Sequence, residues 1–129
     1  VEKEYLISNV IEPFFKHFWI FRNAIDKKNF TLIVDTTVEI ANKIGSSKVI
    51  NKLVDSLKDP SEPYRKMVLQ TIQNIVDILG VDDIDQILEE KLIDGLLYVL
   101  QEQTSEDNYT LLNAFDIIVN KLDRRMKVY

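Results

Sequence analysis

One helical pattern occurs three times along the chain, and this repetition restricts the fold more than any other feature. Each copy opens on an aromatic residue (Phe30, Tyr64 or Tyr109) and continues as an apolar stripe with helical spacing. The copies close on similar phrases, which are IANKIG at residues 40–45, IVDILG at 75–80 and IVNKLD at 118–123. These phrases lie 35 and 43 residues apart. A helical repeat of this length predicts an α-solenoid, a class of protein that usually binds partners.

The composition agrees with one globular, helical domain. The chain has 129 residues with only 3 Gly and 3 Pro, which disfavours a loop-rich or all-β fold. It has no Cys, which excludes disulfides, thiolate metal ligands and thiol catalysis and fits a reducing compartment. No apolar run approaches the ~20 residues of a membrane span, and the N-terminus lacks a signal-peptide pattern. We therefore expect no membrane partner.

Apolar periodicity predicts six helices that pair as three antiparallel hairpins. The expected helices cover residues 3–22, 28–44, 46–58, the stretch from the 59–63 turn to 79, 83–103 and 106–122. Pro13 should kink or break the first helix near Glu12. Gly45 and Gly80 should end the second and fourth helices, and Gly95 should permit a close approach between helices.

Three repeats follow from this pairing, at about residues 3–45, 46–80 and 82–123. Residues 124–129 are expected to begin another element, so the chain is interpreted as a section of a longer array. Polar residues between the helices predict the caps. The expected caps are Asp26 for the second helix, Ser46 or Ser47 for the third, Asp82 or Asp83 for the fifth, and a capping box at residues 104–107 for the sixth.

The charge is unevenly distributed. The net charge is −5, but residues 1–70 carry 11 Lys and Arg against 9 Asp and Glu, while residues 71–129 carry 5 against 12. This division suggests two faces or ends with different partners, although an acidic surface also serves simply to keep a protein soluble.

Basic residues cluster with aromatic residues at the first helix pair. Phosphate contact and ring stacking can together hold a nucleic-acid strand, so this cluster predicts RNA contact. The residues predicted to contact RNA are Lys16, Arg22, Lys27 and Lys28, with His17, Trp19 and Phe21 nearby. The alternative interpretation is an ordinary solvated turn beside core aromatic residues.

Acidic residues gather at the start of the fifth helix. The residues are Asp82, Asp83, Asp85, Glu89 and Glu90. They predict a surface that binds a basic partner, and the alternative is helix capping with favourable placement in the helix dipole.

No constellation of catalytic or cofactor-binding residues is found in the sequence. His17 is the only histidine, and without Cys or a paired base it makes neither a catalytic triad nor a metal site. The acidic cluster lacks the ligand spacing and turn glycine of a Ca²⁺ loop, and no glycine-rich phosphate loop occurs. We expect a protein that is not an enzyme and that has no cofactor, catalytic residue or metal site.

The period and pairing are typical of HEAT repeats, in which an Arg such as Arg65 often braces the neighbouring repeat through an acidic partner. Longer segments carry a more specific resemblance. They are FFKHFW at residues 14–19, VDTTVE at 34–39, ANK at 41–43, YRKMV at 64–68, LIDGLLY at 92–98 and QEQT at 101–104. Through these segments, essentially the whole chain resembles the largest, HEAT-repeat subunit of splicing factor 3b. It departs from the family pattern at Ile20, Phe21 and Phe30.

The resemblance implies an all-α solenoid of HEAT repeats, taken from the middle of that subunit's superhelix. It also implies a non-enzymatic, nuclear scaffold of the U2 small nuclear ribonucleoprotein (snRNP) that supports recognition of the intron branch site. The implied partners are the other splicing factor 3b subunits, U2 snRNA, pre-mRNA and spliceosomal helicases. The alternative is a generic protein-binding HEAT solenoid, such as a transport receptor or a phosphatase scaffold.

Overall fold

The computed structural model describes residues 12–17, 19–102 and 108–127, and within these ranges the chain is helical and contains no strand. The elements are α2 (Glu12–His17), α3 (Phe21–Ile25), α4 (Lys27–Ile44), α5 (Ser46–Leu53), the 3₁₀ helix η2 (Val54–Lys58), α6 (Glu62–Leu79), α7 (Gln86–Glu102) and α8 (Asn108–Lys127). The predicted all-α class is confirmed.

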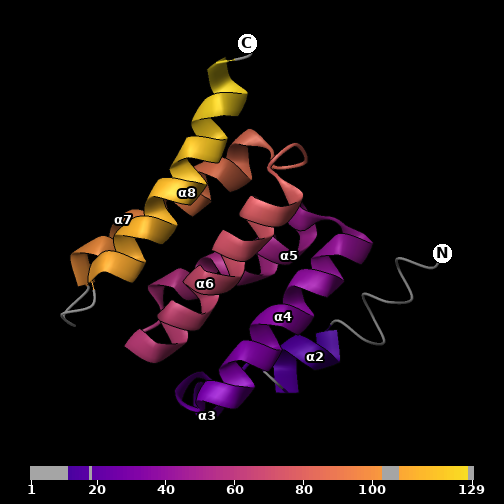
Figure 1. Cartoon of the computed structure of the whole chain (residues 1–129), viewed down its shortest axis with the longest axis vertical. Helices are drawn as coiled ribbons and strands as arrows, with labels where there is room; N and C mark the ends of the chain where they lie inside the picture. The colour runs from indigo at the N-terminus through magenta and orange to yellow at the C-terminus, as the bar shows by residue number, and fades with distance from the viewer. Residues whose placement is uncertain (1–11, 18, 103–107, 128–129) are drawn as a thin grey trace.

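The helices form two layers, as expected for a solenoid. In one layer α4 packs on α6 and α6 packs on α8, so that these three helices follow one another across the molecule (Figure 1). In the other layer α7 packs on η2, and α5 packs against α4 and α6. Each long helix has an apolar stripe that its neighbours cover, which is how a repeat array builds one continuous core.

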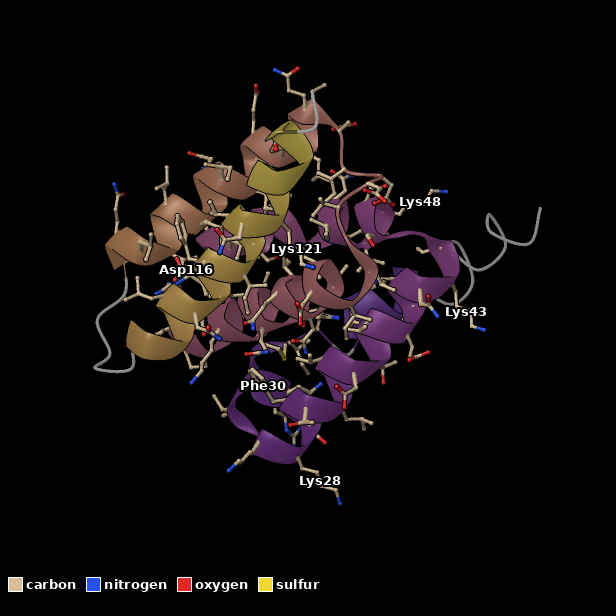
Figure 2. All side chains as sticks on the ribbon, turned by 45° about the horizontal axis from the view of Figure 1, so that its top comes forward. Lys28, Phe30, Lys43, Lys48, Asp116 and Lys121 are labelled. Atoms are coloured by element: carbon tan, nitrogen blue, oxygen red, sulfur yellow. The ribbon has the colours of Figure 1, made fainter. Side chains whose placement is uncertain are left out.

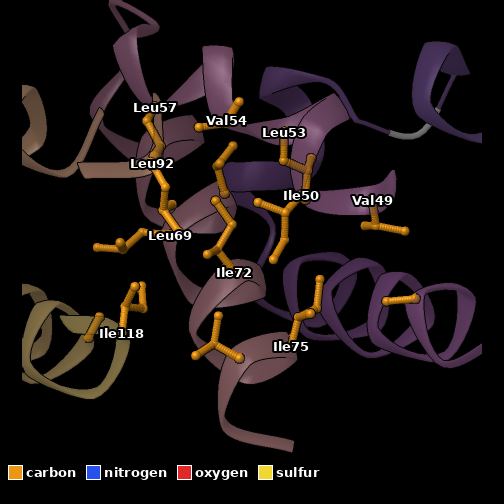
Figure 3. Close-up of a cluster of buried hydrophobic side chains, with 14 of the residues drawn as sticks. Val49, Ile50, Leu53, Val54, Leu57, Leu69, Ile72, Ile75, Leu92 and Ile118 are labelled. Atoms are coloured by element: carbon orange, nitrogen blue, oxygen red, sulfur yellow. The ribbon is translucent and has the colours of Figure 1, made fainter. Parts of the chain in front are cut away.

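The core lies between the two layers and is closed to solvent. Ile50 of α5 and Leu57 of η2 meet Ile72 of α6, together with Leu92 of α7 and Ile118 of α8 (Figure 3). All five side chains are fully buried. Because they come from five elements spread over most of the chain, the helices depend on one another for stability.

Local signals end and begin several helices as the sequence predicts. Asp26 caps α4, because its carboxylate accepts from the backbone N–H groups of Lys28 (3.1 Å) and Asn29 (3.0 Å). Gly45 follows α4 with φ 105° and Gly80 follows α6 with φ 86°. A side chain is strained at such positive φ values, so both positions favour glycine.

Gly95 lies in α7 directly against η2. A Cβ atom added at Gly95 would lie 2.7 Å from Leu57 Cδ1 and 3.1 Å from Leu57 Cβ. The predicted close approach between helices at Gly95 is therefore confirmed, and Leu57 is the residue that occupies the space.

Some predicted boundaries were wrong. The predicted first helix is divided in its described part into α2 and α3, separate helices on either side of residues 19–20. The third helix changes from α to 3₁₀ geometry at Val54. Residues 124–127 continue α8 where a new element was expected. The proposed capping box at residues 104–107 lies outside the described residues.

Two predicted caps were also wrong. Neither Ser46 nor Ser47 caps α5 through its side chain, since Gly45 occupies the N-cap position. The cap of α7 is Asp85, whose carboxylate accepts from Leu88 N at 2.8 Å, instead of Asp82 or Asp83. Within the described residues, no helix is both long and apolar enough to span a membrane.

Candidate interaction surfaces

Contacts between residues about one repeat apart join the second and third helix pairs. Asp83 accepts a hydrogen bond from the backbone N–H of Ser47 at 3.0 Å, and Lys58 forms an ion pair with Asp94. The partners in each pair are 36 residues apart. Both contacts lie between one helix pair and the next, whose relative orientation in a solenoid determines the local curvature.

Arg65 joins the same two helix pairs from a buried position. It is 5% exposed and donates to the carbonyl oxygens of Asp59 (2.7 Å), Pro60 (3.1 Å) and, more weakly, Glu102 (3.5 Å). The expected acidic side-chain partner is therefore replaced by main-chain carbonyls. These carbonyls include one at the C-terminal end of α7, where the helix dipole favours a positive charge.

Trp19 is a core residue, which corrects its predicted place beside an RNA strand. It is 5% exposed, its indole N–H donates to Thr37 Oγ1 at 3.2 Å, and its ring meets the Tyr64 ring edge-on at a centroid distance of 6.1 Å. The Tyr64 hydroxyl donates to the Trp19 carbonyl oxygen at 3.3 Å. A ring enclosed in this way offers no face to a nucleic-acid base.

The predicted RNA-contact residues are all exposed, on α2, α3 and the first turn of α4. They are Lys16, Arg22, Lys27 and Lys28, and His17 beside them is also exposed. Lys28 points away from the molecule (Figure 2). Exposed cations can reach phosphate groups, so RNA contact through these residues stays a prediction.

A hollow of ≈ 700 Å³ opens beside these cations, between α3 and the first turns of α4 and α6. It is lined by Ile25, Lys27, Phe30, Thr31, Glu62, Pro63 and Lys66. Sequence reasoning identified Lys27 but missed the hollow, because α4 and α6 meet here only through the packing of one repeat on the next.

The five acidic residues do not share one task. Asp83 and Asp85 serve as caps of α5 and α7, while Asp82 is exposed in the turn before α7. Glu89 and Glu90 line a second hollow of ≈ 480 Å³ between α7 and α8, together with Ile93, Asp94, Leu97, Val119 and Leu122. Capping therefore accounts for two of the five, and partner binding by the set stays a prediction.

Among the residues that the structure describes, Lys58 and Tyr64 have shifted pKa values. The hydrogen bond from Lys58 to Asp94 raises the pKa of Lys58, and burial raises the pKa of Tyr64. Both shifts have structural causes and neither group lies in one of the hollows described above. In the part of the chain that the structure describes, no three His, Cys, Asp or Glu side chains are grouped so that they could hold a metal ion.

Comparison with known proteins shows which proteins the chain is similar to. No protein-family model matches it. Over all 129 residues it is 42% identical to "U2 snRNP component prp10" of Schizosaccharomyces pombe and 36% identical to "U2 snRNP component HSH155" of Saccharomyces cerevisiae. It spans 11% and 13% of the length of these two relatives. The resemblance found in the sequence is confirmed, because over its whole length the chain matches one segment of each of these U2 snRNP components.

Proposed function

We propose that the chain is a non-enzymatic segment of the largest splicing factor 3b subunit and supports recognition of the intron branch site by the U2 snRNP in the nucleus. The observation that carries this proposal is the match of the complete chain to two U2 snRNP components, at 42% and 36% identity. The solenoid fold supports it, because stacked helix pairs present extended surfaces to large partners.

The proposed mechanism is control of shape. Packing of one helix pair on the next sets the angle between them, and Asp83 with Ser47 and Lys58 with Asp94 add polar contacts between two pairs. That angle contributes to the curvature of the surface that partners meet. The proposed partners are the other splicing factor 3b subunits, U2 snRNA, pre-mRNA and, at later stages, spliceosomal helicases.

The first test is affinity capture of the full-length protein from nuclear extract, followed by sequencing of the bound RNA and identification of the bound proteins. Co-purification of U2 snRNA with the other factor 3b subunits is the expected result. Recovery of proteins without U2 snRNA would contradict the proposal and favour the generic protein-binding solenoid.

RNA contact through the exposed cations is the finer part of the proposal. Since Trp19 is buried, we restrict this contact to phosphates held by Lys16, Arg22, Lys27 and Lys28. The double variant Arg22→Glu with Lys28→Glu should reduce ultraviolet crosslinking between the assembled protein and RNA. Unchanged crosslinking would remove these two residues from the RNA path while leaving the splicing assignment intact.

A further inference from the structure

We propose that the hollow between α3, α4 and α6 binds an acidic protein segment that inserts an apolar side chain. The floor and walls include three apolar residues, Ile25, Phe30 and Pro63. Ile25 is 60% exposed and Phe30 is half-buried, so part of this apolar surface faces solvent. The hollow measures ≈ 700 Å³, which is within the range of pockets that enclose a compact ligand group.

The walls of the hollow are held in place by hydrogen bonds around it. Asp26 caps α4 and so positions Lys27 and Phe30 in its first turn. Ser61 accepts from Tyr64 N at 3.3 Å at the start of α6, beside Pro63, and Ser61 N donates to Asp59 at 2.8 Å. A site whose walls are already ordered loses little conformational entropy when a ligand binds.

The charges around the hollow favour an acidic partner. Lys27 and Lys66 line it from α4 and α6, against one carboxylate, Glu62. The first turns of both 18-residue helices lie at the hollow, and the positive ends of their dipoles add to the potential there. Exposed Arg22 and Lys28 lie close by in the sequence and extend the positive potential.

The same features favour a protein segment over RNA. The most exposed apolar residue of the hollow is Ile25, which offers no aromatic face for base stacking. Phe30 is the one aromatic residue in the lining and is half-buried, and Trp19 is buried. A phosphate backbone carries one negative charge for every nucleotide, so the Glu62 carboxylate would repel an RNA strand in the hollow. A peptide can place an apolar side chain near Glu62 and Pro63 while its carboxylates meet Lys27 and Lys66.

The test is direct binding to the 129-residue chain, measured by fluorescence anisotropy. The probe is a short labelled peptide in which Asp and Glu flank a single Phe, and a uridine oligonucleotide is measured in parallel. Lys27→Glu with Lys66→Glu reverses the two cations of the hollow. The matched control, Lys43→Glu with Lys52→Glu, reverses two exposed cations that do not line it. Circular dichroism verifies that both variants fold.

The hollow variant should bind the acidic peptide about tenfold more weakly, because two glutamates in place of the lysines would put like charges against the carboxylates of the peptide. The control variant should stay within about twofold of the unchanged chain, since screening weakens charges outside the hollow. Ile25→Ser should also weaken binding, and a peptide with Lys in place of its acids should bind the hollow variant better than the unchanged chain.

Equal binding by the unchanged chain and the hollow variant would overturn the proposal, as would no binding of the acidic peptide at all. Binding of the oligonucleotide that is lost in the hollow variant, without peptide binding, would assign the hollow to RNA instead. Because this assay contains no U2 snRNP, its result and that of the affinity capture can fail independently.

Discussion

Tyr64 shows how single residues connect the helix pairs. Its ring meets Trp19 edge-on and its hydroxyl donates to the Trp19 carbonyl oxygen, 45 residues earlier in the chain. Tyr64→Phe keeps the ring and removes only the donor, so it should lower the free energy of unfolding by about 1 kcal/mol at neutral pH. Urea-induced unfolding measures this change, and an unchanged free energy would show that the hydrogen bond makes no net contribution.

The raised pKa of Tyr64 makes its contribution to the free energy of unfolding depend on pH. Burial holds its pKa above the ordinary value of 10.0, so between the unfolded and native pKa values the native state binds more protons than the unfolded state. Its contribution is complete below the unfolded pKa and is lost as pH rises through the native pKa. Lys58, also with a raised pKa, changes stability in the same direction. Tyr64→Phe should therefore make alkaline destabilisation less steep, and an identical slope in both proteins would contradict this assignment.

Glycine is needed at position 95 because a larger side chain would not fit against Leu57, and not because the backbone requires a conformation that only glycine adopts. Alanine favours a helix over glycine by about 1 kcal/mol. At this position, however, the added Cβ would lie 2.7 Å from Cδ1 and 3.1 Å from Cβ of Leu57, whose side chain is fully buried. We expect Gly95→Ala to destabilise the protein by about 1 kcal/mol net, because overpacking costs about 1–3 kcal/mol.

A double-mutant cycle in urea tests the role of Leu57. With Leu57→Ala in the background, the contact with Leu57 Cδ1 is removed and only the 3.1 Å contact with Cβ remains, so Gly95→Ala should be much less destabilising. A destabilising effect of the same size in both backgrounds would show that Leu57 is not the cause.

Among the secondary-structure elements, α5 depends on a cap from the next helix pair. Gly45 supplies no capping side chain, and Asp83 accepts from Ser47 N in its place. Asp83→Ala should cost about 1 kcal/mol, which is typical for loss of an N-cap. It should also speed hydrogen exchange in the first turn of α5.

Asp82→Ala is the matched control because Asp82 is exposed in the turn that also holds Asp83, before α7. This control should change stability by less than about 0.5 kcal/mol. Equal effects of the two substitutions would exclude the cap.

For the whole molecule, Arg65 ties the 59–63 turn and α6 to the C-terminal end of α7. It donates to carbonyl oxygens of Asp59, Pro60 and Glu102 from a buried position. Lysine is a single point charge without the planar fork of arginine, so Arg65→Lys should cost about 2–3 kcal/mol and loosen the last turn of α7.

Urea unfolding and hydrogen exchange in α7 measure this change, with Lys43→Ala at an exposed position of α4 as the control (Figure 2). Full stability of Arg65→Lys would show that the charge alone is sufficient.

The structural features that could be predicted from the sequence depend on residues that are close together in the chain. The apolar stripes, the Asp26 cap and the helix-ending glycines at 45 and 80 are local signals, since a helix turn repeats every 3.6 residues and a cap acts within about one turn. These local signals were enough to predict the all-α class and the helix pairs. Longer stretches of identity carried the family resemblance.

Tertiary structure decided the features whose partners lie far apart. The sequence shows Asp83 beside Asp82, but only the stacking of helix pairs brings Asp83 to Ser47, 36 residues away. It shows Trp19 among basic residues, but only the packing of α4 and α6 encloses the ring. The hollow between α3, α4 and α6 likewise exists only because the first turns of α4 and α6 come together. In each case the feature is stabilised by contacts between segments that are distant in the sequence, and local residue spacing does not encode such contacts.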